Sequence, residues 1–379
     1  MASDEAMIKH HEMRLYMMIC DNNSQAFAQL AIASYHNLKG GVHMSNDKKI
    51  TIGIIGMGRI GNVHFNNLKQ INNVEIKTIC DIVATSDWLE KYSVREVVKD
   101  YHEVLDGPEI QAVLICTPTD LHPEMTIDAA NAGKDIFCEK PVGFDDEAIL
   151  KAFNTVKKTG VKFEVGFNRR FDKNFDRIVD YRNEGSLGDE QILKITSRDP
   201  EPPSMDYVRH SGGIFMDMTI HDFDMARFIT NEEVDRVFVT GNVMVNDEIG
   251  KAGDIDTAII TLMFKNGMMG VIDNSRQAVY GYDQRIELFG SKGMAHADNV
   301  TDSTTTYSSK DNVAGDKPMF FFLQRYMDAY KRELESFFGA VRGEHDVQCT
   351  FEDGIRAIRL AQAAKQSLDT GKVVSVKDI

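Results

Sequence analysis

The stretch GIIGMGRIG, residues 53–61, carries three glycines in the spacing GxGxxG, at Gly56, Gly58 and Gly61. It ends the β-branched, apolar run ITIGIIG, which predicts a buried strand, and leads into NVHFNNLKQI, whose apolar spacing predicts a helix. A glycine turn between a strand and a helix places free backbone N–H groups where they can bind the phosphates of a dinucleotide. The alternative is a tight turn that is merely rich in glycine.

Asp81 favours the nucleotide interpretation. It ends the next predicted strand, VEIKTICD (74–81), twenty residues after Gly61, which is the spacing of the acidic residue that binds the ribose 2′-OH of NAD. A carboxylate repels the 2′-phosphate of NADP, and Ile82 and Val83 offer that phosphate no cation. Arg59, inside the turn, is a cation that could approach the 2′-phosphate, so NADP is disfavoured but not excluded. We therefore expect an NAD site formed by Gly56, Gly58, Arg59, Ile60, Gly61 and Asp81.

The order of predicted elements divides the chain. Up to about residue 170, predicted strands (109–118, 135–141, 162–170) alternate with predicted helices (122–133, 145–160), as in a doubly wound parallel α/β sheet whose ligands bind at the carboxyl ends of its strands. After that, longer groups of strands, a hairpin at KNG (265–267) and two closing amphipathic helices predict an α+β region with a large, open, mainly antiparallel sheet. We therefore expect an N-terminal extension (1–45), an NAD-binding Rossmann domain (46–168) and an α+β domain for substrate binding and oligomerisation (169–379).

The amino-acid composition limits the kinds of binding partner and the cellular compartment that we expect. The net charge is −15, from 43 basic and 58 acidic residues, which argues against nucleic acid and anionic membranes as partners. No apolar stretch is long enough to span a bilayer. The five cysteines are odd in number and form no CxxC pair, which argues against a disulfide framework or a zinc site and favours a cytoplasmic protein. Residues 1–43 lack the features of a signal peptide, and we expect them to have no catalytic role, as a short helix or a disordered segment.

A second motif, FCEKP (137–141), ends a predicted strand and places Glu139 and Lys140 beside the expected cofactor. Four motifs, GIIGMGRIG, CTPTDLH (116–122), CEKP and GGIFMDMTIHDFD (212–224), occur in this order. Together they resemble the glucose–fructose oxidoreductase and inositol dehydrogenase family (Gfo/Idh/MocA), from about residue 50 to the C-terminus. GFNRRFD, SRDP and YGYD are most similar to inositol 2-dehydrogenases within that family.

The resemblance implies an NAD-dependent dehydrogenase that oxidises a secondary hydroxyl of myo- or scyllo-inositol to the inosose ketone. It implies that Lys140 orients the reacting hydroxyl and stabilises charge as that hydroxyl loses its proton, whereas on sequence alone Lys140 could also be a solvated lysine in a turn. The Lys140–Pro141 bond is a candidate for the cis form. The family is tetrameric, and a sheet with one uncovered apolar face fits such an assembly. The implied cofactor contacts are Thr117, Pro118, His122, Glu139 and Lys140, although His122 could also simply begin a helix.

Asp217 and His221 are the predicted acid–base pair. Residues 211–229 predict one helix, on which these two residues are spaced i, i+4 and share a face. His221 can take a proton near neutral pH, and Asp217 can orient it or contact the substrate. The alternatives are a weak surface pair and a metal site that includes Asp222 and Asp224. We expect no metal, because these two aspartates do not share the face of Asp217 and His221 and no second histidine stands at ligand spacing.

Further residues are predicted to contact the substrate. Arg169 could bind polyol oxygens, with Arg170 or a structural ion pair as alternatives, and the resemblance implies a substrate contact at Asp199. Tyr280 and Tyr282 could reach the site or pack on the sheet. Two other functions stay open at this point: another sugar or polyol dehydrogenase of the same family, and a non-catalytic NAD-binding regulator. Such a regulator would be free to lose Lys140, Asp217 or His221, and all three are present.

Overall fold

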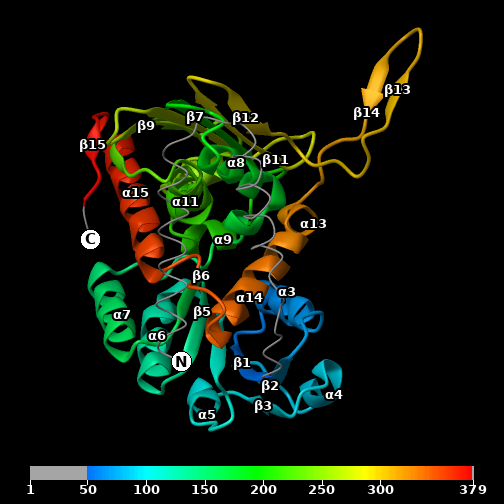
Figure 1. The fold of residues 1–379 in the computed structure, drawn as a ribbon, viewed down its shortest axis with the longest axis vertical. Helices are drawn as coiled ribbons and strands as arrows, with labels where there is room; N and C mark the ends of the chain where they lie inside the picture. Colours follow the sequence, from blue (N-terminus) through cyan, green and yellow to red (C-terminus); the bar gives the residue numbers. More distant parts are fainter. Residues whose placement is uncertain (1–48, 378–379) are drawn as a thin grey trace, which may run out of the picture. The chain divides into compact units, whose positions relative to one another are not determined.

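The computed structural model of the chain describes residues 49–377. The predicted N-terminal extension, residues 1–45, lies outside the described residues. Two β-sheets organise the described part, one of six strands and one of seven, and a two-stranded hairpin belongs to neither of them (Figure 1).

The six-stranded sheet is parallel throughout, as the sequence predicts. Its order is β3-β2-β1-β4-β5-β6, so the chain starts in the middle and adds strands first on one side and then on the other. All strands therefore end at the same edge, where the strand order reverses beside β1 and ligands of such sheets bind. The strands are β1 (Ile50–Ile55), β2 (Val74–Cys80), β3 (Glu96–Val98), β4 (Ala112–Ile115), β5 (Asp135–Glu139) and β6 (Phe163–Gly166).

Helices cover both faces of this sheet. On one face, apolar residues of α6 and α7 pack against β4 and β5; on the other face, residues of α3 and α14 pack against β1 and β4. α14 comes from the end of the chain, so the two halves of the chain share one hydrophobic core at this face. The helices up to residue 183 are α3 (Arg59–Leu68), α4 (Trp88–Tyr92), α5 (Tyr101–Leu105), α6 (His122–Asn131), α7 (Asp146–Thr159) and α8 (Lys173–Asn183), with short 3₁₀ turns at Thr119–Leu121 and Asn168–Phe171.

The seven-stranded sheet is mainly antiparallel, in the order β12-β11-β7-β10-β9-β8-β15, and only β10 and β7 run parallel. The predicted hairpin at KNG is the turn between β9 and β10. The strands are β7 (Glu190–Arg198), β8 (Val234–Asn242), β9 (Thr257–Phe264), β10 (Met269–Ser275), β11 (Asp283–Gly290), β12 (Met294–Ala297) and β15 (Val374–Ser375).

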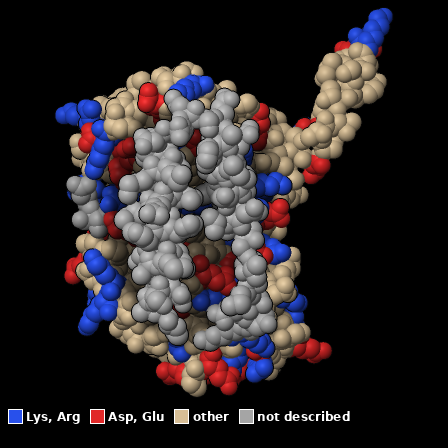
Figure 2. Space-filling view, in the orientation of Figure 1, with Lys and Arg blue, Asp and Glu red and all other residues tan. Residues whose placement is uncertain are grey.

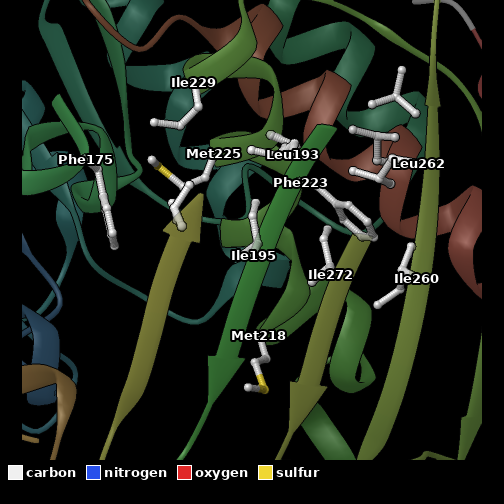
Figure 3. Close-up of a cluster of buried hydrophobic side chains, with 14 of the residues drawn as sticks. Phe175, Leu193, Ile195, Met218, Phe223, Met225, Ile229, Ile260, Leu262 and Ile272 are labelled. Carbon is white, nitrogen blue, oxygen red and sulfur yellow. The ribbon is translucent and has the colours of Figure 1, made fainter. Parts of the chain in front are cut away.

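One face of this sheet, here called the inner face, is covered by α8, α11 and α15. Figure 3 shows Phe223, Met225 and Ile229 of α11 lying over Leu193 and Ile195 of β7 and its neighbouring strands. The alternation of buried and exposed residues along β9, β10 and β11 leaves the opposite, outer face open. The helices of this half are α9 (Met205–His210), α10 (Gly213–Asp217), α11 (Thr219–Thr230), α12 (Asp247–Lys251), α13 (Phe322–Arg325), α14 (Met327–Arg342) and α15 (Phe351–Thr370).

The predicted single helix at 211–229 is wrong, because the structure has two helices that meet at Met218. In a continuous helix the Asp217 carbonyl would accept the His221 N–H. Instead, that carbonyl accepts a hydrogen bond from the Lys140 side chain, and the His221 N–H bonds to Met218. The helix is thus interrupted where Lys140, which follows β5, bonds to the Asp217 carbonyl.

Residues 301–317 also differ from the sequence-based interpretation of a polar loop. They contain a hairpin of β13 (Thr306–Ser308) and β14 (Val313–Gly315), paired antiparallel. The strands are three residues long, which is too short for hydrophobic periodicity to be read from the sequence.

Among residues 49–377, no helix combines the length and the apolar character that crossing a membrane requires. The four cysteines of this part, Cys80, Cys116, Cys138 and Cys349, are free and buried.

Candidate active site

The glycine turn has the geometry of a phosphate cradle. Gly56 has a φ of +94°, and a side chain there would lie 2.7 Å from the Cys116 carbonyl oxygen. A Cβ at Gly61 would lie 2.0 Å from the Gly56 carbonyl oxygen, so glycine lets helix α3 pack tightly against the turn. At Gly58, in contrast, a Cβ would meet no atom within 4 Å. The first turn of α3, which begins at Arg59, therefore opens onto free space with its backbone N–H groups available for an anion.

Asp81 lies at the carboxyl end of β2, next to the glycine turn. Its carboxylate accepts hydrogen bonds from the backbone N–H groups of Met57 at 2.8 Å and Val83 at 3.0 Å. These bonds fix the carboxylate at the edge of the turn, where the ribose of a dinucleotide is bound in such folds. The Arg59 guanidinium lies 5.4 Å from the centre of the Phe322 ring.

His122 joins the two other loops at this edge. It is the first residue of α6 and is buried, with its ring nitrogens 2.9 Å from the Thr117 carbonyl oxygen and 2.8 Å from the Pro141 carbonyl oxygen. Burial lowers its pKa. The imidazole therefore links residues 116–118, which follow β4, to residues 139–141 at the end of β5. Pro118 precedes the 3₁₀ turn that lies between Thr117 and His122.

Lys140 follows β5, and the Lys140–Pro141 bond is cis, as predicted. Its Nζ atom donates a hydrogen bond to the Asp217 carbonyl oxygen at 2.9 Å and lies 3.8 Å from the Asp217 carboxylate. The structure thus brings together two predicted catalytic residues that are 77 positions apart in the chain.

Asp217 is the centre of a polar cluster. Its carboxylate accepts hydrogen bonds from the Tyr207 hydroxyl at 2.7 Å and from the Arg276 guanidinium at 2.8 Å. Burial by itself would raise the pKa of Asp217, but the charges of Lys140 and Arg276 outweigh it, so the pKa is lowered. Asp217 is therefore a carboxylate at neutral pH.

Arg276 is a site residue that the sequence-based reasoning missed. It directly follows β10, is only 2% exposed, and lies between Asp217 at 2.8 Å and Asp199 at 3.7 Å. Its Nε and second terminal nitrogen have no partner among the described residues. The only sequence signal was a cation at the end of a predicted strand, and without the strand order nothing pointed it toward Asp217.

His221 is the third residue of α11, and no hydrogen bond joins it to the Asp217 carboxylate. Its ring contacts Phe167 edge-on at 5.8 Å between ring centres, and its buried Nδ1 has no partner among residues 49–377. Burial, together with the positive charges of Lys140 and Arg169, lowers its pKa well below 6.5. The ring is therefore neutral at pH 7. The predicted Asp217–His221 pairing is replaced by the contacts of Asp217 with Tyr207 and Arg276, because the helix breaks between the two residues.

Arg169 and Arg170 hold α11 in place through ion pairs. Arg169 donates to the Asp222 carboxylate at 2.6 Å, and Arg170 donates to both oxygens of Asp224. All four side chains are buried. These pairs account for the two aspartates that an alternative metal site would have used, and they match the structural ion pair that was the alternative for Arg169.

The other two predicted substrate contacts lie at different places. Asp199 follows β7 beside Arg276, and burial raises its pKa to about 6, although Arg276 opposes that shift. The Tyr280 hydroxyl donates to Asp283 at 2.5 Å and accepts from Arg198 at 3.1 Å. Asp199 thus belongs to the same cluster as Asp217, whereas the contacts of Tyr280 tie it to a neighbouring ion-pair group.

Glu139 is part of a buried group below Lys140. It interacts with His64 Nε2 at 2.6 Å and accepts a hydrogen bond from the Lys140 backbone N–H at 3.2 Å. Glu333 of α14 is also buried there, and its carboxylate lies within 4.8 Å of the His64 ring nitrogen and the Glu139 carboxylate. Neither of the Glu333 oxygens has a hydrogen-bond partner among the described residues. Burial and the charge of Glu139 raise the pKa of Glu333 well above its usual range. Sequence reasoning missed His64 and Glu333, which sit among ordinary helix patterns.

Comparison with known proteins identifies the family of both parts of the chain. Residues 50–167 match the model of the oxidoreductase family with an NAD-binding Rossmann fold (GFO_IDH_MocA), and residues 175–296 match the GFO/IDH/MocA C-terminal domain.

The chain is 51% identical to an uncharacterized oxidoreductase of Bacillus subtilis, YrbE, over 87% of this chain and 97% of the relative. It is 47% identical to a myo-inositol 2-dehydrogenase of Thermotoga maritima, over 86% of this chain and 99% of the relative. Among solved structures, scyllo-inositol dehydrogenase of Lactobacillus casei with bound NAD(H) and scyllo-inositol superposes with a TM-score of 0.81, at 30% identity over 87% of this chain and 99% of that one.

Proposed function

This chain belongs to the Gfo/Idh/MocA oxidoreductase family, and from that premise we propose that it is an NAD-dependent inositol 2-dehydrogenase. Its reaction is the oxidation of one secondary hydroxyl of myo- or scyllo-inositol to the inosose ketone. The proposal is supported by Lys140, which bonds to Asp217 and lies close enough to His221 for its charge to lower the pKa of that histidine, and by the parallel sheet that bears the glycine turn.

The residues at this edge fit a dinucleotide. The open space at Gly58 and the free start of α3 suit a pyrophosphate, and the fixed carboxylate of Asp81 suits a ribose with free hydroxyls. We propose Thr117, Pro118, His122, Glu139 and Lys140 as further cofactor contacts, because they follow or end β4 and β5 at the same edge of the sheet. Bound NAD supplies a hydride acceptor. The chain supplies position, charge and a proton acceptor.

His221 is the proposed base. Oxidation of an alcohol requires removal of the hydroxyl proton, and the neutral imidazole of His221 can accept it at pH 7. The Lys140 ammonium donates a hydrogen bond to the same hydroxyl oxygen and stabilises negative charge that develops on it. Asp217 receives Lys140 on its carbonyl and carboxylate, so it orients the ammonium toward the substrate.

The polar cluster behind these residues suits a polyol. Asp199, Asp217 and Arg276 present acceptors and donors close together, and Arg276 retains two nitrogens without partners among the described residues. Vicinal hydroxyls can pair with both kinds of group. We propose Asp199 and Asp217 as substrate contacts, with Arg169 acting through Asp222 on the position of α11.

The test measures the reduction of NAD and of NADP, through the absorbance of the reduced cofactor, with each member of a panel of inositol isomers and simple sugars. We expect turnover with myo- or scyllo-inositol and NAD, slower turnover with NADP, and a primary isotope effect with substrate deuterated at the reacting carbon. Turnover with sugars alone would assign a different substrate within the family. Tight NAD binding without turnover of any compound would favour a regulator and overturn the proposal.

We also propose a cytoplasmic location and a homotetrameric assembly. The four free, buried cysteines of the described part suit a reducing compartment. The outer face of the seven-stranded sheet exposes Ile259, Met269, Phe289 and Met294, which assembly would bury.

A further inference from the structure

The hydroxyl of Tyr207 bonds directly to the Asp217 carboxylate. The distance is 2.7 Å, and the accepting oxygen, Oδ1, is also the oxygen that lies 3.8 Å from Lys140 Nζ. The other oxygen, Oδ2, accepts a hydrogen bond from Arg276 at 2.8 Å. An ionised carboxylate can accept about four hydrogen bonds, so both oxygens keep room for a further donor such as a substrate hydroxyl. Tyr207 and Arg276 thus hold the two oxygens of one carboxylate from different sides of the sequence.

The backbone before Asp217 brings Tyr207 to this carboxylate. Tyr207 lies in α9, which begins after its N-cap, Ser204, whose hydroxyl accepts a hydrogen bond from the Tyr207 N–H at 3.3 Å. After α9, Gly212 and Gly213 have φ values of +80° and +82°, a conformation that glycine adopts without strain. The two glycines let α10 start directly after α9, and α10 ends at Asp217. Tyr207 and Asp217 therefore meet although two consecutive helices carry them.

Tyr207 lies at the boundary between this polar cluster and solvent. It is 42% exposed. The side chains of Lys140, Asp217 and Arg276 are less exposed, at 17%, 12% and 2%. Burial and the charge of Asp217 nevertheless raise the pKa of the Tyr207 hydroxyl, while the charges of Arg276 and of Arg59 in the glycine turn oppose that shift. The ring therefore lies at the surface, and the hydroxyl is turned inward and stays protonated.

From these contacts we propose that Tyr207 is a positioning residue of the substrate site. Its hydroxyl fixes the Asp217 carboxylate, so that the remaining lone pairs of Asp217 accept substrate hydroxyls while Oδ1 stays beside Lys140. A neutral donor suits this role, because it orients the carboxylate without adding a cation that would compete with Lys140. The inference rests on the proposed dehydrogenase function, since it assigns Tyr207 to the same site.

The role of Tyr207 has a consequence for the titration of Asp217. The titratable groups that face Asp217 among the described residues are Lys140 after β5, Asp199 after β7, Arg276 after β10 and Tyr207 of α9. Burial raises the pKa of Asp217, and the charges of Lys140 and Arg276 together with the bond from Tyr207 lower it. Removal of the Tyr207 hydroxyl leaves the other groups in place, so the pKa of Asp217 should rise.

The test compares Tyr207→Phe, which removes only the hydroxyl, with Tyr207→Leu, which also removes the ring. Tyr307→Phe is the matched control, because Tyr307 is an exposed tyrosine of β13. Figures 1 and 2 show the hairpin of β13 and β14 standing clear of the sheets and helices of the described chain. The measurements are steady-state kinetics with inositol and NAD over a range of pH, and the dissociation constant of NAD.

We expect Tyr207→Phe to lower kcat/KM for inositol by about 10-fold or more, because it removes a hydrogen bond to a charged group. The acid limb of its pH–rate profile should move upward, and NAD affinity should not change. Tyr207→Leu should lose at least as much, and the control should match the unmodified enzyme. A Tyr207→Phe enzyme with unmodified kinetics would overturn the proposal. A loss of rate with the acid limb left in place would also overturn it, because a merely structural role predicts that result.

Thermal unfolding without substrate or cofactor gives a readout that does not depend on the dehydrogenase function. A carboxylate whose pKa is lowered by folding stabilises the protein above the ordinary aspartate pKa of about 3.9, and this stabilisation is lost as pH falls through the lowered pKa. Tyr207→Phe should therefore be less stable than the unmodified protein at neutral pH, and the difference should shrink toward acid pH. A difference of the same size at every pH would refute the role of Tyr207, whether or not the chain oxidises inositol.

Discussion

The proposed cofactor edge and the proposed substrate cluster of this molecule are built in different ways. The cofactor edge is made mainly by the backbone of one continuous segment, from β1 through the glycine turn into α3, with Asp81 added at the end of the next strand. The substrate cluster is made by side chains from four distant segments, which bring Lys140, Asp199, Asp217 and Arg276 together. A site made by backbone needs only local sequence, whereas a site made by side chains needs the whole fold.

This difference predicts that substitutions in the substrate cluster affect turnover and those at the cofactor edge affect cofactor affinity. The largest effect is expected at His221. The variant His221→Ala removes the proton acceptor, so kcat should fall by about 10²–10⁴-fold while NAD affinity stays unchanged. Steady-state kinetics and titration of NAD binding measure the two quantities.

His210→Ala is the matched control, because His210 is an exposed histidine whose ring bonds only to its own helix backbone. For the unmodified enzyme, the lowered pKa of His221 predicts that activity persists below the ordinary histidine pKa of about 6.5. Full turnover of His221→Ala would remove His221 from the proposed mechanism.

The next effect is expected at Arg276. The variant Arg276→Met keeps the buried volume but removes one of the two cations, Lys140 being the other, whose charges lower the pKa of Asp217, so that pKa should rise. Loss of a hydrogen bond to a charged group costs about 1.5–3 kcal/mol, which predicts a fall of about 10- to 100-fold in kcat/KM. A raised pKa means that Asp217 becomes protonated at higher pH, so the acid limb of the pH–rate profile should move upward.

The variant Arg276→Lys should restore part of the rate, and Arg285→Met, which removes a surface arginine paired with Asp283, should leave the profile in place. An unchanged acid limb in Arg276→Met would show that Asp217 does not depend on Arg276.

At the cofactor edge the expected effect is smaller and falls on binding. Asp81→Ser removes the carboxylate that is positioned for the ribose hydroxyls, so NAD affinity should weaken about 10-fold, and the repulsion of a 2′-phosphate should disappear. Dissociation constants for NAD and NADP measure both changes, with Asp87→Ser as an exposed control in the same half of the molecule. If the ratio of the two constants did not change, the ribose assignment would be wrong.

The smallest catalytic effect is expected at Glu333, which is buried beside His64 of α3 and Glu139 of β5. Its raised pKa means that it is protonated in the folded protein and ionised in the unfolded chain at pH 7. Stability should therefore fall as pH rises above the ordinary glutamate pKa of about 4.3. Glu333→Gln mimics the protonated form, so turnover should stay within about 2-fold of the unmodified enzyme. That change is smaller than the loss of a hydrogen bond would cause.

Thermal unfolding at several pH values checks this expectation. The stability of Glu333→Gln relative to the unmodified protein should grow as pH rises, while Glu335→Gln, an exposed position on the same helix, should follow the unmodified protein. A strongly destabilised Glu333→Gln at neutral pH would mean that Glu333 is ionised and paired in the folded state.

The sequence by itself determined the parallel sheet, the mainly antiparallel sheet and the glycine turn with Asp81. These features follow from local patterns, because strands, helices and glycine turns are specified by neighbouring residues. Motif resemblance added Lys140, Asp217 and His221 without their geometry.

Only the tertiary structure decided which side chains of the proposed substrate cluster contact one another. Lys140 bonds to the Asp217 carbonyl where the predicted helix is interrupted at Met218, the Asp217 carboxylate bonds to Arg276, and the ring of His221, the proposed base, is neutral. Likewise, the burial of Glu333 beside Glu139 and the exposure of the β13–β14 hairpin depend on strand order and packing. Contacts between residues far apart in the chain set these properties, and no local pattern of residues encodes them.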